Sequence, residues 1–344
     1  MGRAAGSRTL SPARARQPVD RQIDNDDVRV RPPRRGSRPR TKQRPRHEDA
    51  ASGMVTTVDR GRYTCLVGDE VVLAMRAREL GRGSVVVGDE VALVGDMSGQ
   101  PGSLARIVRI EPRRTVLRRT ADDTDPYERV VVANADQLVV VTSLADPPPR
   151  TGLIDRCLVA GYAGGLDPLL CLTKSDLAPA EELLDRYAAL GLATVTTRRD
   201  QEPAPLRERL AGRTSVLVGH SGVGKSTLVN RLVPAADRSV GAVSAIGKGR
   251  HTSTSAVALA LPGGGWVIDT PGIRSFGLAH VTPDDLLGAF PDLEQGTTGC
   301  PPNCEHLSAA DGCALDAWVG AGSADPARLE AYRRLLRSRT AEDR

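Results

Sequence analysis

The stretch Gly219-His-Ser-Gly-Val-Gly-Lys225-Ser226 decides the fold of this 344-residue chain. It matches the spacing G-x-x-x-x-G-K-[ST], whose glycines let backbone N–H groups wrap a phosphate at the start of a helix. An apolar run at 215–218 precedes it, and a helical pattern begins at 225. Lys225 would reach the β- and γ-phosphates of a nucleotide, and Ser226 would ligate Mg²⁺. The predicted phosphate site consists of Gly219, His220, Ser221, Gly222, Val223, Gly224, Lys225, Ser226 and Thr227.

A second motif, Asp269-Thr-Pro-Gly272, ends the apolar run at 265–268. An acid at such a strand end holds Mg²⁺ through water, as in nucleotide-binding proteins with this type of loop. We predict that Asp269 has this role and that the Gly272 N–H binds a γ-phosphate.

A third motif, Thr173-Lys-Ser-Asp176, follows the apolar run at 169–172 and resembles the guanine-reading Asn/Thr-Lys-x-Asp motif of GTPases. A carboxylate accepts hydrogen bonds from guanine N1–H and the exocyclic amine, whereas adenine offers no such donor pair. The resemblance assigns base recognition to Thr173, Lys174, Ser175 and Asp176, and residues 195–197 would form the remaining base-side loop. Asp176 lies 43 residues before Gly219, so the guanine motif precedes the phosphate loop and the order is circularly permuted.

Between the phosphate loop and Asp269, residues 247–254 have the composition of a mobile switch loop. A threonine there would ligate Mg²⁺ only when a γ-phosphate is present, and we expect Thr252, with Thr254 as the second choice. Ile273 stands where many GTPases place a water-orienting glutamine. Because isoleucine cannot orient water, we expect His251 to act in catalysis with Thr252 and Lys225.

The lysine content supports these assignments. The chain has 47 basic residues, but only Lys42, Lys174, Lys225 and Lys248 are lysines. The two side chains are not interchangeable, because lysine carries a compact point charge and arginine a planar, forked guanidinium group. Three of the four lie in or beside the predicted nucleotide motifs, which favours a real nucleotide site over chance glycine-rich turns.

A cysteine cluster follows the nucleotide motifs. Cys300, Cys304, His306 and Cys313 supply three thiolates and one imidazole, the ligand set of a closed structural zinc site. Cys65, Cys157 and Cys171 stand alone on apolar runs and are expected in the core.

The remaining sequence divides into segments. Residues 1–52 are rich in Arg and Pro and are predicted to be a disordered tail. Short strands over 53–118, including 71–75, 84–87, 90–94 and 104–110, predict an OB-like barrel. Residues 119–279 begin with a linker over 119–135 and continue with alternating strands and helices, which predict a mostly parallel α/β sheet. Residues 280–344 hold the cysteine cluster and a final helix opened by Asp325-Pro326.

Composition excludes several protein classes. No run approaches the roughly 18 apolar residues that span a membrane, and no apolar segment follows the first arginines as in a secretory signal. We expect a cytoplasmic protein, and a monomer by default. The formal net charge is +5, but residues 1–50 hold 14 basic and 6 acidic residues, so the rest of the chain is slightly acidic. RNA binding there would use local patches, Arg106/Arg109/Arg113/Arg114 or Arg333/Arg334/Arg337.

Over 53–340 the chain resembles the ribosome small-subunit-dependent GTPases of the RsgA (YjeQ) family. The resemblance is carried by Ala133-Asn-Ala-Asp-Gln137, 173–176, 219–226, Gly249-Arg-His-Thr-Ser-Thr254, Asp269-Thr-Pro-Gly-Ile273 and the cysteine cluster. It implies a circularly permuted α/β P-loop GTPase with an N-terminal OB-like β-barrel and a C-terminal zinc-binding helical module. It also implies GTP and GDP as ligands with Mg²⁺ and one structural Zn²⁺, hydrolysis stimulated by the small ribosomal subunit, contact with ribosomal RNA, and a role in late subunit maturation. One departure is the zinc spacing Cys-x3-Cys-x-His-x6-Cys, which differs by one residue in two gaps from the usual family pattern.

Three alternatives remain compatible with the sequence. An ATP-using enzyme such as a kinase is disfavoured by 173–176. A permuted GTPase of another ribosomal particle, such as the large subunit, is disfavoured by the barrel and the cysteine cluster. An RNA-binding protein with a weakly active nucleotide site is disfavoured by Lys225, Ser226 and Asp269, although Ile273 is compatible with it.

Overall fold

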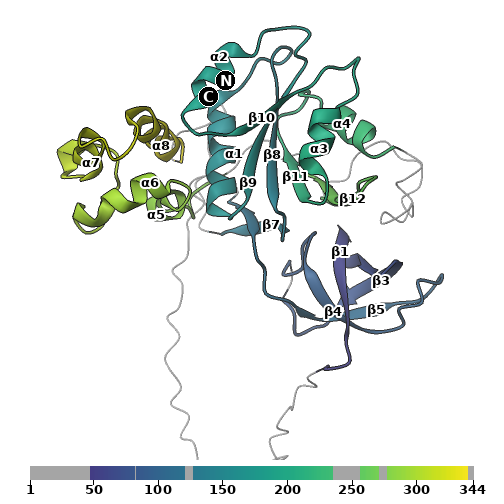
Figure 1. Cartoon of the computed structure of the whole chain (residues 1–344). Coiled ribbons are helices and arrows are strands. Elements are labelled where there is room, and N and C mark those ends of the chain that lie inside the picture. Colours follow the sequence, from purple (N-terminus) through teal and green to yellow (C-terminus); the bar gives the residue numbers. More distant parts are fainter. Residues whose placement is uncertain (1–46, 82, 121–126, 235–255, 271–276, 340–344) are drawn as a thin grey trace, which may run out of the picture. The chain divides into compact units, whose positions relative to one another are not determined.

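The computed structural model describes residues 47–81, 83–120, 127–234, 256–270 and 277–339 (Figure 1). The predicted tail and the predicted switch loop at 247–254 lie outside these residues, apart from the last six positions of the tail. None of the described helices is long and apolar enough to cross a membrane.

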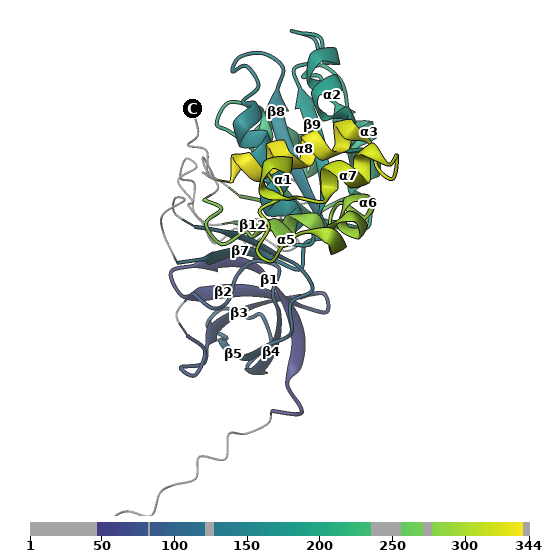
Figure 2. The same ribbon diagram turned by 90° about the vertical axis from the view of Figure 1, so that its left-hand side faces the viewer.

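Five strands form the N-terminal barrel, as predicted (Figure 2). They are β1 (Ala51–Asp59), β2 (Arg62–Val67), β3 (Glu70–Arg76), β4 (Glu90–Gly95) and β5 (Ala105–Ile110). The hydrogen-bonded order β1-β2-β3-β5-β4 closes because β4 also pairs with β1. Closure leaves the ring without free edges, and its interior is filled by aliphatic residues such as Val55, Val72, Leu93 and Ile107.

A second set of strands forms an α/β sheet in the order β10-β9-β8-β11-β13-β12. Its strands are β8 (Gln137–Ser143), β9 (Asp167–Thr173), β10 (Ala193–Thr196), β11 (Thr214–Val218), β12 (Val257–Ala260) and β13 (Trp266–Asp269). All neighbouring pairs are parallel except β12 with β13. The carboxyl ends of the parallel strands therefore share one edge, where ligands of such sheets bind. At its far side β12 pairs with barrel strand β1 at Thr57 and Val257.

Helices cover both faces of this sheet. Successive residues of a strand point to opposite faces, so Leu138 and Val140 of β8 join one core while Val139 and Val141 join the other. The first core includes α1 (Thr151–Ala163), and the second includes α3 (Ala204–Leu210) and α4 (Lys225–Leu232). Figure 1 shows α1 on one side of the strands and α3 and α4 on the other. Helix α2 (Glu181–Ala188) lies above α1 in this view and contributes to the same core.

The C-terminal module is helical, as predicted. It contains α5 (Pro283–Leu287), α6 (Pro291–Glu294), α7 (Leu315–Gly320) and α8 (Pro326–Ser338), with short 3₁₀ turns at Gln295–Gly299 and Ala309–Asp311. The Asp325 carboxylate accepts a hydrogen bond from Ala327 N at 2.8 Å, which caps α8 where the sequence predicted.

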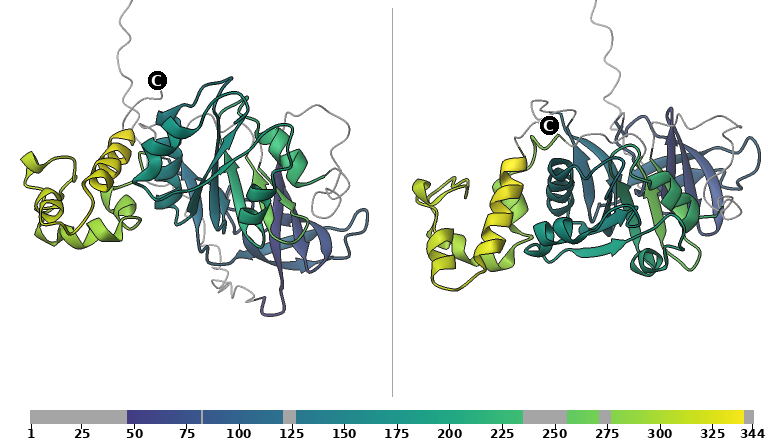
Figure 3. Two further views of the ribbon diagram at one scale, coloured as in Figure 1. Left: turned by 45° about the horizontal axis from the view of Figure 1, so that its top comes forward. Right: turned by 90° about the horizontal axis from the view of Figure 1, so that it is seen from above.

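Helix α8 lies alongside α1 (Figure 3). The carboxylate of Asp155, almost fully buried on α1, pairs with Arg334 of α8 at 3.4 Å. Arg156 donates to the Ser338 carbonyl oxygen at 2.7 Å, and Phe290 packs edge-on against Tyr162 and Tyr332. Charge pairing and aromatic packing thus attach the C-terminal module to the α/β sheet.

Two expectations about local structure were wrong. Residues 84–87 form no strand, because the Asp89 carboxylate accepts from Val86 N at 2.8 Å and bends the chain, leaving one bridge from Val87 to Val132. The segment expected as a linker instead contributes to a hairpin of β6 (Val116–Arg119) and β7 (Arg129–Ala133). Burial of Leu117 and Val132 stabilises this hairpin against the core of the sheet.

Several arginines of the predicted patches serve internal ion pairs. Arg113 forms a two-point contact with the fully buried Asp89, and Arg333 forms one with Asp316. Arg334 pairs with Asp155. Arg113, Arg333 and Arg334 therefore stabilise the fold through these ion pairs. The other arginines of the two predicted patches are exposed: Arg106, Arg109, Arg114 and Arg337.

Candidate nucleotide site and metal centre

The three nucleotide motifs meet at the carboxyl edge of the sheet. Leu217 of β11 lies beside Val139 of β8 and beside Asp269 of β13. The guanine motif begins at Thr173, the last residue of β9, which is the next strand beyond β8. Strand position rather than chain order therefore brings residues 173–176, 219–227 and 269 together.

The phosphate loop has the backbone that only glycine readily adopts. Gly219, Gly222 and Gly224 have φ angles of +149°, +84° and +99°. A Cβ on Gly219 would lie 2.1 Å from the Val141 carbonyl oxygen, so no side chain fits there. Helix α4 starts directly at Lys225 without a side-chain cap, which leaves its first N–H groups directed at the loop. Ser226 and Thr227 are exposed in this first turn.

Lys225 folds back over the loop. Its Nζ donates to the carbonyl oxygens of Gly219 and, at 3.2 Å, of His220. Burial lowers the pKa of Lys225, while the negative charge of Asp269 opposes this shift. A bound phosphate would add further negative charge beside the ammonium group and favour its protonated form.

The end of β13 is tied to the strand of the phosphate loop. The buried Thr270 hydroxyl donates to the Leu217 carbonyl oxygen at 2.6 Å. This bond fixes the chain directly after Asp269, whose carboxylate acts electrostatically on Lys225. Gly272 and Ile273 lie beyond the described residues, as do His251, Thr252 and Thr254.

Thr173 joins the guanine motif to the phosphate loop. Its buried hydroxyl lies 2.6 Å from the Val223 carbonyl oxygen and 3.3 Å from that of Thr142. Lys174 has a positive φ of +57°, and its Nζ donates to the Asp146 carbonyl oxygen. The carboxylate of Asp176 is exposed and has no hydrogen bond to any residue the structure describes. It is therefore available to accept from a base.

The base-side loop is anchored to the same motif. Ser175 N donates to the Thr197 carbonyl oxygen at 3.3 Å, and Thr197 N donates to that of Leu172 at 2.7 Å. The predicted segment 195–197 thus lies next to 173–176.

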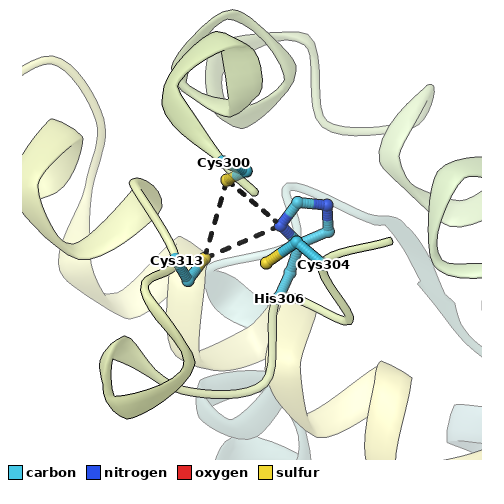
Figure 4. A group of neighbouring side chains, drawn as sticks. All are labelled: Cys300, Cys304, His306 and Cys313. Atoms are coloured by element: carbon cyan, nitrogen blue, oxygen red, sulfur yellow. Dashed lines mark hydrogen bonds between the residues drawn. The ribbon is translucent and has the colours of Figure 1, made fainter. Parts of the chain in front are cut away.

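The four residues of the cysteine cluster come together in the C-terminal module as a candidate metal centre (Figure 4). The ligand atoms of Cys300, Cys304, His306 and Cys313 all lie within 4.8 Å of one another. His306 Nδ1 is 3.6 Å from the sulfurs of both Cys300 and Cys313, which are 4.0 Å apart. Tetrahedral zinc, with bonds of about 2.3 Å to sulfur and 2.0–2.1 Å to nitrogen, separates its ligand atoms by about 3.6–3.8 Å. The donor set fits zinc, as do the distances among Cys300, His306 and Cys313, and the unusual sequence spacing does not prevent the four residues from converging.

Contacts around the cluster orient its ligands. Ala314 N donates to the Cys300 sulfur at 3.3 Å, which would stabilise a thiolate. Arg333 Nε donates to the His306 carbonyl oxygen at 3.0 Å and so attaches the ligand loop to α8. Cys65, Cys157 and Cys171 are buried in the cores as expected, and burial raises the pKa of the Cys65 and Cys171 thiols to about 12.

Comparison with known proteins places the chain in a family. A family model described as RsgA GTPase matches residues 110–279. "Small ribosomal subunit biogenesis GTPase RsgA" of Chlorobaculum tepidum is 37% identical over 85% of this chain and 99% of that protein. The chain belongs to the RsgA GTPase family. The protein of the same name from Alcanivorax borkumensis is 41% identical over 71% of this chain and 70% of its own length.

Solved structures agree on the fold. The crystal structure of YjeQ from Thermotoga maritima superimposes with a TM-score of 0.62 at 24% identity, covering 85% of this chain and 99% of that one. The structure of YloQ, described as a circularly permuted GTPase, gives a TM-score of 0.59 at 23% identity, covering 86% and 97%. The circularly permuted P-loop fold predicted from motif order is thereby confirmed.

The structure also adds residues to the RsgA-type site that sequence reasoning missed. Thr142 and Asp146 contribute only carbonyl oxygens, which every residue type carries, so no sequence signal marks them. Arg231, at the end of α4, is one of many arginines and belongs to no motif.

We predict that Thr173→Val weakens GDP binding about tenfold. The substitution keeps the shape but leaves the buried Val223 carbonyl oxygen without its donor, at a cost of about 1–3 kcal/mol. We expect the loop to relax to relieve this cost in the free protein, and spending about 1.4 kcal/mol of binding free energy to restore the loop geometry lowers the affinity tenfold. Titration with a fluorescent GDP analogue measures this. Thr173→Ser keeps the hydroxyl and should bind within about twofold of the unaltered protein; equal affinity of the Val and Ser variants would contradict the prediction.

Proposed function

We propose that this protein hydrolyses GTP to GDP and phosphate with Mg²⁺ and assists the late maturation of the small ribosomal subunit. The observation that carries the proposal is the convergence of Asp176, Lys225 and Asp269 at one sheet edge despite their permuted order. The names of the relatives, which refer to small-subunit biogenesis, support the choice of particle.

The roles of the site residues follow from their positions. Asp176 would accept from the guanine edge, and the N–H groups of 219–227 would bind the phosphates around Lys225. Ser226, Thr252 and Asp269 would hold Mg²⁺, directly or through water, and bound Mg²⁺ would neutralise charge on the β- and γ-phosphates. Gly272 would bind the γ-phosphate, and His251 would orient the attacking water because Ile273 cannot.

The remaining parts supply binding surfaces. We propose that Cys300, Cys304, His306 and Cys313 hold one structural Zn²⁺. We further propose that the segments 1–52, 53–118, 119–279 and 280–344 act as tail, barrel, GTPase domain and zinc module of a cytoplasmic monomer.

The barrel offers a surface suited to ribosomal RNA. Arg62 of β2, Met75 of β3 and Arg106 of β5 are cross-strand neighbours and are exposed. Met75 and the nearby Leu104 are 41% and 42% exposed, which is unusual for large apolar side chains in the described structure. Arg78 lines the same open hollow of about 430 Å³ beside Met75 and Arg106. Arginines that bind phosphates around an apolar contact for a base or sugar are typical of RNA-binding surfaces.

GTP turnover measured with purified small subunits, with large subunits and without either tests the proposal. We expect slow turnover alone and stimulation by small subunits only. The double variant Arg62→Ala/Arg106→Ala should bind small subunits more weakly. Its binding constant should also fall less steeply with salt concentration, because about two phosphate contacts are lost. Arg209→Ala, an exposed arginine on α3, is the matched control. Stimulation by large subunits instead, or faster hydrolysis of ATP than of GTP, would overturn the proposal.

A further inference from the structure

The side chain of Arg231 connects the two halves of the proposed nucleotide site. It lies in the last turn of α4, the helix that begins with Lys225. Its NH1 donates to the carbonyl oxygens of Arg198 and Arg199, both at 3.0 Å. NH2 lies 3.6 Å from Glu202, and the side chain is only 21% exposed.

The carbonyl groups bound by Arg231 belong to the residues that directly follow the predicted base-side loop, 195–197. This loop leaves β10 through Thr197, whose carbonyl oxygen accepts from Ser175 of the guanine motif. Residues 198–200 follow on the surface, and their side chains are exposed. Arg231 thus binds the chain directly after the base-side loop, and Thr197 of that loop is itself hydrogen-bonded to the guanine motif.

The geometry requires the guanidinium group. One nitrogen bridges two successive carbonyl oxygens while the other faces a carboxylate, an arrangement that uses the planar fork of arginine. A lysine ammonium is a single point of charge and cannot satisfy both sides in the same way. The carbonyl groups at the C-terminal end of α4 further favour a cation there.

We propose that Arg231 is a positioning residue for guanine binding, fixing the base-side loop to the phosphate-binding helix. This inference rests on the proposed function, because it concerns affinity for the base of GTP and GDP. The phosphates contact the first turn of α4, and the base contacts a loop held by its last turn. One rigid helix of eight residues therefore sets the distance between phosphate and base subsites.

The test compares ligands that do and do not carry the base. Arg231→Ala should weaken GDP binding about tenfold, mainly through faster dissociation, because it removes hydrogen bonds from a charged donor. Its affinity for inorganic tripolyphosphate, which occupies only the phosphate loop, should stay within about twofold. In subunit-stimulated hydrolysis the KM for GTP should rise while kcat is retained. Arg231→Lys should recover part of the affinity.

Arg207→Ala is the matched control. Arg207 donates to the Arg231 carbonyl oxygen at 3.1 Å and lies 3.4 Å from Glu202, but it bonds to neither loop carbonyl. We expect its GDP affinity to remain within about twofold. The inference is overturned if folded Arg231→Ala protein binds GDP like the unaltered protein, if tripolyphosphate binding falls equally, or if Arg207→Ala has the same effect. Failure of the unaltered protein to bind GDP would instead refute the proposed function.

Discussion

Lys225→Met is expected to lower GTP turnover on the order of 10²–10³-fold, even with saturating small subunits. The ammonium group is the cation of the phosphate loop, and removing one preorganised electrostatic partner of a transition state costs about this factor. The variant should fold normally, because within the described residues the Lys225 side chain hydrogen-bonds only to the carbonyl oxygens of Gly219 and His220.

Single-turnover hydrolysis of labelled GTP, with thermal denaturation as the folding check, measures the effect. Lys42→Met changes a lysine of the N-terminal tail that no nucleotide motif includes, and it should retain full turnover. Hydrolysis by Lys225→Met within a few-fold of the unaltered protein would show that the phosphate loop does not perform catalysis.

Cys313→Ser is expected to abolish zinc binding and destabilise the C-terminal module. Zinc bound to such a ligand set contributes about 10–16 kcal/mol of apparent binding free energy, which becomes folding free energy because the ligands are not preassembled when unfolded. The ligand loop is connected to α8 through Arg333 and the His306 carbonyl oxygen, so the destabilisation should extend beyond the loop. We expect Tm to fall on the order of 10 °C.

Elemental analysis should give one zinc per chain for the unaltered protein and none for Cys313→Ser. Treatment of the unaltered protein with a strong chelator should reproduce the lower Tm. Cys65→Ala removes a buried thiol from the barrel core and should keep its zinc. Undiminished zinc content in Cys313→Ser would exclude this cluster as the metal centre.

The spacing of the motifs predicted which described residues meet at the carboxyl edge of the sheet. Gly219 is marked by the backbone conformation that the loop needs, and Lys225 by its charged side chain at a fixed spacing from it. The hydrogen bonds of Thr173 and Arg231 were not predictable in the same way, since both side chains bind carbonyl oxygens whose positions depend on the folded chain.

Tertiary packing also decided which local patterns became strands. Residues 84–87 have strand-like composition, yet the Asp89 carboxylate takes the Val86 N–H that a sheet would have used. Residues 129–133 were expected to be part of a linker, but they form strand β7, because Val132 is buried in the core against the sheet. Arg113 and Arg333 were expected to belong to exposed basic patches. Their ion-pair partners, Asp89 and Asp316, are distant in sequence, so the pairing was not visible there.

The place of β11 between β8 and β13 has a consequence for synthesis of the chain. Translation produces β8, β9 and β10 before β11, although β11 is the direct neighbour of β8. At 5–20 residues per second, the interval between completion of β8 and of β11 is roughly 4–15 s. Throughout that interval the edge of β8 that β11 will cover presents unpaired backbone groups, the type of edge that invites pairing with another chain. In this permuted fold, β8 therefore lacks its neighbour on that side until the chain has been made as far as Val218.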